Sequence, residues 1–286
     1  MTQAGRPRKR SWSVSEADMD DLELVKRLAE RVLGATTAYV SAHADFADII
    51  RRRPRDVTRK LDMYAEQALD RAIVEEGISA RVISEEIGER IVPAGSRPAL
   101  TLLLDPVDGS NNMAAGIPYY CTSLALSRKT EAATFADVEA AAVASVCCGT
   151  YYTARGKGAF LDGKKISPAR REGKPAYAIY SYGAGAIPGG LIALEEGDCI
   201  VRTMGSIALD ICMVARGTFD AVIDTRSKVS GYDFMGAALI LKEAGGEICR
   251  TNGTGPDTLP LDVSGVSIIA AAGRTMLDRL LTVVNQ

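Results

Sequence analysis

The apolar run ALTLLL, residues Ala99–Leu104, leads directly into Asp105 and Asp108. A short run without charges, bounded by turn residues, is typical of a buried β-strand. The run ARVIS, residues 80–84, ends in the same way at Glu85. Carboxylates that meet at strand ends raise each other's pKa unless a cation neutralises them. This feature therefore predicts a buried sheet with an acidic edge that can bind a cation.

The remaining pattern predicts two different halves. Ser15 can cap a long amphipathic helix, a polar loop covers residues 49–60, and a second helix ends at Gly77. We expect strands at TSLALS, AAAVASVC and TYYTAR, then a glycine-punctuated turn region, and after Pro168 an alternation of strands and helices. The prediction is a basic flexible tail (1–14), an α+β subdomain with the metal and phosphate site (15–167) and an α/β subdomain (168–286).

Composition excludes several classes of function. The net charge of −2 comes from well-mixed acids and bases, so we expect neither nucleic acid nor a membrane surface as partner. The only histidine, His43, follows a helical pattern without neighbouring ligands, which argues against serine–histidine–aspartate catalysis and histidine metal centres. The six cysteines contain no CxxC pair, although Cys147 and Cys148 are adjacent, and they suggest reduced thiols in a cytoplasmic protein.

The stretch DPVDGSNN carries the candidate chemistry. A turn at Pro106 can direct both aspartates and the Val107 carbonyl into one pocket, and oxygen ligands of this kind favour Mg²⁺. A helix beginning at Gly109 and Ser110 would point its N–H groups at a phosphate. Two ordinary interpretations stay open, because the stretch can be a simple Asx turn and Asp233 can be only a helix N-cap.

Five motifs in order carry a resemblance to a known family. ISEE, DPVDGSNN, GKGAFLDGKKI, VRTMGSIALDICMVARGTFDAVID and GYDFMGAALILKEAGG resemble the pattern of the inositol monophosphatase superfamily. The form DTRSKVSGYD is most similar to its archaeal-type branch, which acts on both inositol monophosphate and fructose 1,6-bisphosphate. The resemblance implies a layered αβαβα sandwich and two or three Mg²⁺ ions per site.

The resemblance also implies roles for individual residues. The metal ligands would be Glu85, Asp105, the Val107 carbonyl, Asp108 and Asp233. Glu85, Ser110, Asp56 and Thr58 would be catalytic, with Ser110 and Asp56 in the positions of a pair that activates water. Gly109 and Ser110 would hold the phosphate, and Asp233 would also contact the substrate. From their own chemistry, Tyr182, Arg202 and Arg226 are further candidates for substrate contact.

The expected activity is hydrolysis of small sugar or polyol phosphates, inositol 1-phosphate or fructose 1,6-bisphosphate, by in-line attack of a metal-activated water in a homodimer. Arg202 and Arg226 can bind a second phosphate or can be structural, and Tyr182 can border the sugar or belong to a mobile loop. Alternatives are a nucleotide or other sugar phosphatase of the same superfamily, or an inactive member with a regulatory role. The D-x-x-D spacing argues against the D-x-D of aspartyl-phosphate phosphatases, and Val107 breaks the oxygen alternation of a calcium loop.

Overall fold

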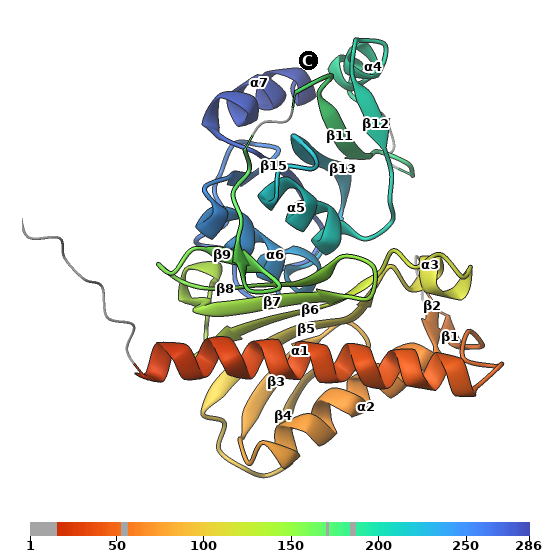
Figure 1. Ribbon diagram of the computed structural model, residues 1–286, viewed down its shortest axis with the longest axis vertical. Coiled ribbons are helices and arrows are strands. Elements are labelled where there is room, and N and C mark those ends of the chain that lie inside the picture. Colours follow the sequence, from red (N-terminus) through yellow and green to blue (C-terminus); the bar gives the residue numbers. More distant parts are fainter. Residues whose placement is uncertain (1–15, 53–56, 170–171, 184–186) are drawn as a thin grey trace, which may run out of the picture.

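The computed structural model describes residues 16–52, 57–169, 172–183 and 187–286, with only the main chain at residues 16–20 and 195 (Figure 1). Its helices are α1 Glu16–Ala42, α2 Lys60–Glu75, α3 Ser110–Ala114, α4 Gly189–Glu195, α5 Ile207–Ala215, α6 Gly231–Ala244 and α7 Arg274–Val284, with a 3-10 turn at Phe135–Asp137. Its strands are β1 Ile49–Arg52, β2 Val57–Arg59, β3 Ala80–Ser84, β4 Gly88–Val92, β5 Leu100–Asp108, β6 Cys121–Ser127, β7 Ala140–Ser145, β8 Gly149–Ala154, β9 Ala159–Leu161, β10 Lys164–Lys165, β11 Ala176–Tyr180, β12 Ile200–Arg202, β13 Ala221–Val229, β14 Glu247–Arg250 and β15 Val266–Ala271.

The first sheet has eight strands in the order β10-β9-β8-β7-β6-β5-β3-β4. Neighbouring strands run antiparallel except β3 and β5, which are parallel and bring Ser84 opposite Leu104. One face of this sheet packs on α1 and α2 through a core that includes Val25, Leu28 and Leu69. The parallel pair matters for function, because the carboxyl ends of β3 and β5 lie at the same edge of the sheet.

The second sheet has five strands in the order β12-β11-β13-β15-β14. Its first three strands are parallel, whereas β15 runs antiparallel to both β13 and β14. α4 and α7 cover one face through a separate core that includes Tyr177, Leu191 and Leu280. The other face turns toward α5 and α6.

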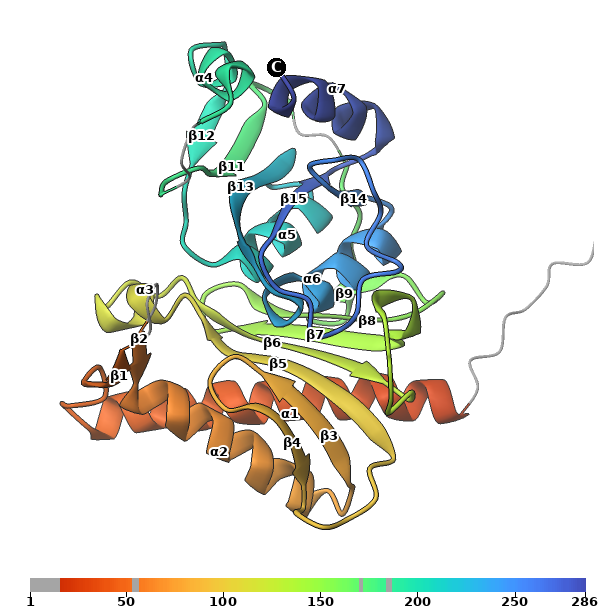
Figure 2. The ribbon, with the colours of Figure 1, turned by 180° about the vertical axis from the view of Figure 1, so that it is seen from behind.

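α5 and α6 lie between the two sheets and bury side chains against both (Figures 1 and 2). The layers are therefore α1 and α2, the first sheet, α5 and α6, the second sheet, and α4 and α7. This order confirms the predicted αβαβα sandwich. A single core cluster reaches from Phe135 and Tyr151 near the first sheet to Ile268 in the second, so the middle helices join the two sheets.

Several local predictions were wrong. Residues 49–59 do not form only a polar loop, because β1 and β2 pair antiparallel beside α3 at one edge of the molecule (Figure 2). The turn region after residue 155 contains the short strands β9 and β10. The chain also does not turn at Pro106, since β5 continues as a strand to Asp108. In each case backbone pairing extends a segment whose composition alone resembles a loop.

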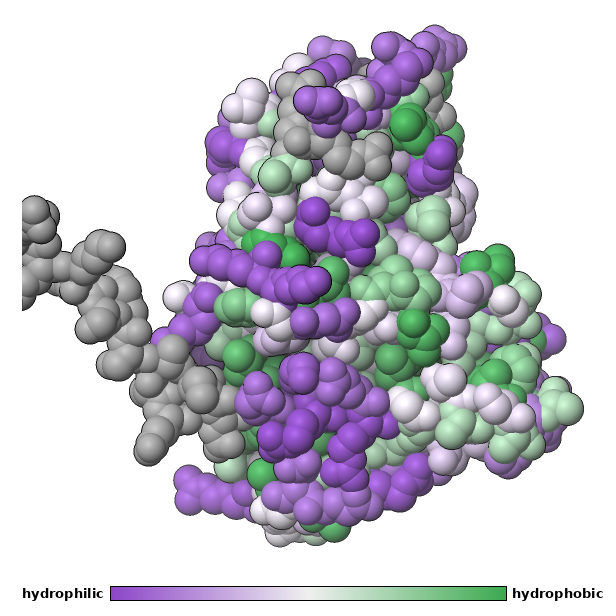
Figure 3. Space-filling view, viewed as in Figure 1, coloured by the Kyte–Doolittle hydropathy of each residue, from purple (hydrophilic) through white to green (hydrophobic). Residues whose placement is uncertain are grey.

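Hydrophilic side chains gather over the lower left and centre of the molecule in Figure 3, while hydrophobic and pale ones cover much of the right-hand side, where α1 ends. The inner face of α1 is apolar, and its Val25, Leu28 and Val32 are fully buried. None of the helices in the described ranges combines the length and apolar character needed to cross a bilayer.

Candidate functional site

A β-bulge places the two aspartates of DPVD. Asp105 pairs with Ser123 and Asp108 with Cys121, so Pro106 and Val107 lie opposite the single residue Thr122. The Thr122 hydroxyl donates to the Pro106 carbonyl at 2.9 Å, and the Val107 N–H donates to Asp105 Oδ1 at 3.0 Å. The extra residue bends the strand, and both carboxylates line one pocket of about 210 Å³.

Glu85 enters the same pocket from the end of β3. Glu66 of α2 fixes the turn that begins at Glu85. Glu66 is fully buried and forms an ion pair with Arg90 at 2.7 Å. Glu66 Oε1 accepts the backbone N–H groups of Glu86 at 3.1 Å and Ile87 at 3.4 Å. A buried ion pair therefore fixes the backbone that carries Glu85.

Asp108 connects the first sheet to the N-terminus of α5. Its carboxylate accepts the Ser206 hydroxyl at 2.8 Å and the backbone N–H groups of Ile207 at 3.2 Å and Ala208 at 2.7 Å. These N–H groups belong to the first turn of a helix, where they have no partner within the helix. The contact positions Asp108 and also docks α5 against the strand that ends there.

Gly109 allows the chain to turn sharply from β5 into α3. Its φ of +96° lies in the left-handed region, and a Cβ at this position would come within 3.0 Å of the Tyr119 carbonyl. α3 begins at the next residue, Ser110, as the sequence predicted. Gly109, Ser110 and Asn111 all line the pocket.

Asp233 reaches the pocket from the first turn of α6. It is not the N-cap: Ser230 occupies that position, and the Ser230 N–H donates to Asp233 Oδ2 at 2.6 Å. Asp233 therefore belongs to a capping box at the third helical position. One oxygen completes the cap, and the same side chain lines the pocket, so the two interpretations of Asp233 do not exclude each other.

The carboxyl groups in the pocket resist ionisation. Burial raises the pKa of Asp105 well above its usual value, and the charges of Glu85, Asp108 and Asp233 add to the effect. Burial also raises the pKa of Asp108 to about 6, although the hydrogen bonds from Ser206 and α5 oppose it. For Asp233, burial and the Asp108 charge outweigh the Ser230 hydrogen bond and raise the pKa to about 8.

The negative charges of these four acids repel one another, and a bound cation would neutralise them. The available donors are oxygens, with no imidazole or thiolate among the pocket-lining residues, and this set suits a hard ion such as Mg²⁺. Among the described residues, no three acidic, histidine or cysteine side chains converge into a closed coordination sphere. The residues thus fit the ion by the chemistry of their oxygen donors and by lining one pocket.

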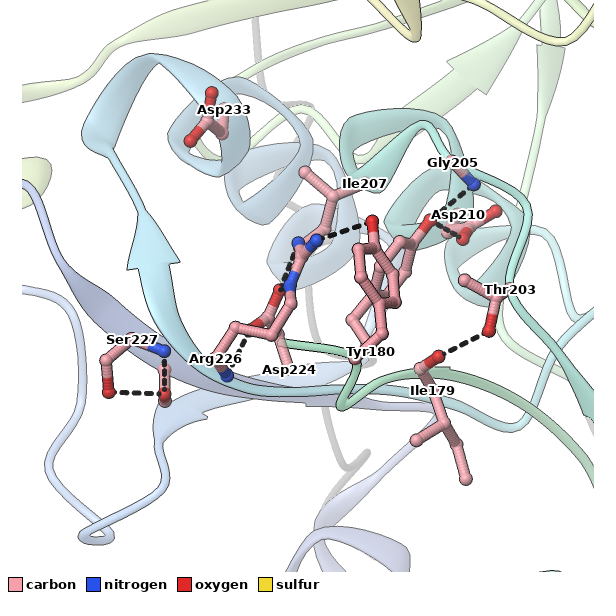
Figure 4. Close-up of polar contacts among 12 residues, drawn as sticks. Ile179, Tyr180, Thr203, Gly205, Ile207, Asp210, Asp224, Arg226, Ser227 and Asp233 are labelled. Carbon is pink, nitrogen blue, oxygen red and sulfur yellow. Dashed lines mark hydrogen bonds and ion pairs between the residues drawn. The ribbon is translucent and has the colours of Figure 1, made fainter. Parts of the chain in front are cut away.

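Arg226 also lines the pocket, and several neighbours fix its side chain (Figure 4). Arg226 forms an ion pair with the fully buried Asp224 at 2.6 Å, and its Nη1 donates to the Tyr182 hydroxyl at 2.7 Å. Its guanidinium also lies 4.7 Å from the Tyr180 ring centre and 4.8 Å from that of Tyr182. The ion pair, the hydrogen bond and the two ring contacts therefore hold Arg226 in place before any ligand binds.

A second buried acid supports this part of the pocket. The carboxylate of Asp210, on α5, accepts the hydroxyls of Tyr119 at 2.5 Å and Tyr180 at 2.6 Å. The Tyr180 oxygen in turn accepts the Gly205 N–H at 2.9 Å. Burial raises the pKa of Asp210 to about 7. This network fixes the ring on which Arg226 stacks and ties it to the loop before α5.

The structure brings together most of the predicted site residues. The pocket is lined by Glu85, Asp105, Val107, Asp108, Gly109, Ser110, Tyr182, Arg226 and Asp233. Two other predicted residues lie apart from it. Thr58 is buried in β2 and donates to Glu86 at 2.6 Å, and Arg202 is exposed on β12, where its Nη1 donates to the Val201 carbonyl. Neither placement supports a direct contact with substrate. Asp56 lies outside the described residues.

The sequence interpretation did not assign several residues that the structure places at the site. Tyr180 and Lys228 line the pocket, and Asp210 supports Tyr180 from below. Signals for two of them were present. Asp210 is the only charged residue in the apolar helix IALDICMVA, and a buried acid in such a helix needs partners. Lys228 continues the alternation Asp224, Arg226 along the strand.

The fold and the pocket define a class of layered αβαβα proteins whose oxygen-donor pocket is lined by residues of both sheets and of the helices between them. The chain belongs to the inositol monophosphatase family, whose model matches residues 18–286. It is 32% identical over 228 residues to a fructose-1,6-bisphosphatase/inositol-1-monophosphatase of Thermococcus kodakarensis, covering 79% of this chain and 82% of that one. Its identity to the protein of the same name from Methanothermobacter thermautotrophicus is 31% over 261 residues, covering 88% and 91%.

The structure of a hypothetical protein from Pyrococcus horikoshii, described as having similarities to inositol-1 monophosphatase, matches with a TM-score of 0.75 at 25% identity. The match covers 93% of this chain and 100% of the other. The predicted resemblance is thereby confirmed, and the chain is a member of a phosphatase family.

Proposed function

We propose that this chain is a magnesium-dependent phosphatase that hydrolyses fructose 1,6-bisphosphate, inositol 1-phosphate or both. The observation that carries the proposal is the group of buried acids, Asp105, Asp108 and Asp233, whose raised pKa values call for a cation, beside the start of α3. The names of the two archaeal relatives support the choice of substrates.

The chain's own residues have separable tasks in this proposal. The oxygens of Glu85, Asp105, Asp108, Asp233 and the Val107 carbonyl would hold the metal. Bound there, Mg²⁺ would supply an activated water and neutralise the charge of the transferred phosphoryl group.

The hydroxyl of Ser110 and the backbone at Gly109 would orient the phosphate at the start of α3. Tyr180, Arg226 and Tyr182 would limit which sugar or polyol fits in the pocket beside the phosphate. The proposal keeps Asp56 as a catalytic residue on the strength of the resemblance alone. A homodimer and a cytoplasmic location also stay predictions.

The test is phosphate release from inositol 1-phosphate, fructose 1,6-bisphosphate and nucleotide phosphates, with Mg²⁺ and with excess chelator. We expect turnover of the first two substrates, and none in chelator. Asp105→Asn should lower turnover at least about 10²-fold, the usual loss when one group that stabilises transition-state charge is removed.

Asp257→Asn is the matched control, because it makes the same chemical change at an exposed ion pair with Lys242 outside the pocket. Full turnover in excess chelator would refute the proposed requirement for Mg²⁺. Folded protein without activity on any of these phosphates would instead favour a regulatory family member.

A further inference from the structure

Two adjacent cysteines occupy the turn between β7 and β8, apart from the candidate site. The Sγ atoms of Cys147 and Cys148 lie 3.0 Å apart, and the Ser145 hydroxyl lies 3.5 Å from Cys147 Sγ. Cys147 is exposed, whereas Cys148 is half-buried against the main core. None of these residues lines the phosphatase pocket. The proposed function therefore leaves this pair of thiols unexplained.

The backbone disfavours a disulfide between these two residues. Adjacent Cα atoms across a trans peptide are about 3.8 Å apart. Disulfides usually join Cα atoms separated by roughly 4.4–6.8 Å, and shorter separations store strain that makes the bond easier to reduce. The pair is thus better suited to remain a dithiol than to close on itself.

A single larger atom between the sulfurs removes this difficulty. An ion with metal–sulfur bonds of about 2.3 Å holds two sulfurs about 3.8 Å apart in tetrahedral geometry, so the sulfurs, now 3.0 Å apart, need to separate by about 0.8 Å. Thiols select soft ions. Among the described residues, no group of three potential metal ligands occurs. An atom bound at this turn would therefore have only the two cysteine sulfurs as protein ligands.

We propose that Cys147 and Cys148 form a dithiol site for a trivalent arsenical. A monosubstituted arsenical, R–As=O, needs two thiols and brings its own third substituent. Both As–S bonds form, the two thiol protons leave with the arsenic-bound oxygen as one water molecule, and no atom changes its oxidation state. The product is a ring that contains both sulfurs and the arsenic.

The protonation of Cys148 also favours this occupant over zinc. Burial and the neighbouring Cys147 raise the pKa of the Cys148 thiol to about 12, although the nearby Arg216 charge opposes them. A zinc ion binds thiolates and would have to displace that proton. Condensation with an arsenical starts from the thiol and releases the proton as water.

The test uses the full chain and phenylarsine oxide. One equivalent should remove two reactive thiols per arsenic, counted with a thiol reagent, and a dithiol should release the arsenic while excess monothiol does not. Cys147→Ser and Cys148→Ser should each weaken binding at least about 10²-fold, because the second bond of a two-point attachment gains from effective concentration.

Cys199→Ser is the matched control, since Cys199 is half-buried like Cys148 but stands alone in sequence. It should bind phenylarsine oxide as tightly as the unchanged chain. The proposal would be overturned if phenylarsine oxide still removed two thiols per arsenic in Cys147→Ser. It would also be overturned if the unchanged chain bound phenylarsine oxide no more tightly than that variant. Because Cys147 is exposed, its replacement leaves the core intact. The readout is binding, so it is independent of phosphatase activity.

Discussion

Single side chains in the pocket serve structure and chemistry together. Asp233 closes the capping box of α6 with one oxygen and lines the pocket, and Asp108 both docks α5 and belongs to the acidic group. Substitutions that keep the hydrogen bond and remove only the charge can separate these roles. Asparagine does this at Asp233, where one oxygen accepts the Ser230 N–H. At Asp108 both oxygens accept hydrogen bonds, so an amide NH2 there would face a donor.

For Asp233→Asn, we expect an unchanged or slightly higher stability of the metal-free protein and an activity at least about 10²-fold lower. The asparagine oxygen can still accept the Ser230 N–H, while the repulsion with Asp108 disappears. Thermal unfolding in chelator and phosphate release with Mg²⁺ measure the two effects. Near-normal turnover at low Mg²⁺ would mean that Asp233 only caps its helix.

Lys228 is the better candidate for recognising a second phosphate. Arg226 is already committed to Asp224 and Tyr182, and its removal would leave a buried carboxylate without its partner. Lys228→Ala should raise KM for fructose 1,6-bisphosphate by roughly 10-fold, the size of one hydrogen bond to a charged group, and change KM for inositol 1-phosphate much less.

Arg202→Ala is the control for Lys228, because it removes an exposed cation that lies away from the pocket. Steady-state kinetics on both substrates gives the comparison. Equal changes in KM for the two substrates would show that Lys228 does not distinguish them.

At the scale of helices and strands, the sequence predicted the elements that carry a strong pattern. β3 and β5 are apolar runs with acids at their ends, and α5 and α6 are apolar helices of 9 and 14 residues. It did not predict β9, β10 or β14, because these short strands depend on pairing with neighbours rather than on their own composition. The bulge at Pro106 was missed for the same reason, since register is a property of two strands.

The acids were predicted more fully than their supports. DPVD and Asp233 are visible as motifs, whereas the Asp210 network joins Tyr119 and Tyr180 from distant parts of the chain. A single sequence does not reveal which distant side chains meet. Thr58 was assigned from the resemblance and Arg202 from the capacity of an arginine to bind phosphate. The fold places Thr58 against Glu86, next to Glu85, and Arg202 at an exposed position on strand β12.

Two neighbouring glycines in α4 offer a test of packing against α7. A Cβ on Gly190 would come 2.0 Å from the Val283 carbonyl, whereas one on Gly189 would meet nothing within 4 Å. Gly190→Ala should lower the free energy of unfolding by about 1–3 kcal/mol, as overpacking usually does. Gly189→Ala should be neutral or slightly stabilising.

Denaturant unfolding measures both glycine variants. Turnover should stay unchanged in each, because α4 and α7 cover the face of the second sheet that points away from the pocket. Equal destabilisation by the two variants would contradict the predicted contact.

At the scale of the whole molecule, the acidic pocket links stability to pH and metal. Asp108 and Asp233 have pKa values of about 6 and 8, above the ordinary 3.8, so the folded protein holds their protons more tightly than the unfolded chain. Their contribution to stability is complete below pH 3.8 and is lost as pH rises to about 8. Each carboxyl changes stability by at most about 1.4 kcal/mol per pH unit in that window.

The metal-free protein should therefore lose stability from these groups between pH 5 and pH 8, and the Asp233→Asn variant should lose less. Added Mg²⁺ should raise the melting temperature more at pH 8 than at pH 5, because it favours the ionised acids. Thermal unfolding at both pH values, with and without Mg²⁺, measures this. If Mg²⁺ raised the melting temperature equally at both pH values, its binding would not depend on the ionisation of these carboxyls.

The hydrogen bonds from α5 to Asp108 also set an order of events during synthesis. Asp105 and Asp108 leave the ribosome about a hundred residues before Ser206, Ile207 and Ala208, and still earlier than Asp233. Until the later segment folds, Asp108 lacks the N–H groups that fix it, and both early acids lack the last carboxylate of the pocket. The site of a nascent chain is therefore incomplete, and the chain can bind metal and phosphate there only after its final third has folded.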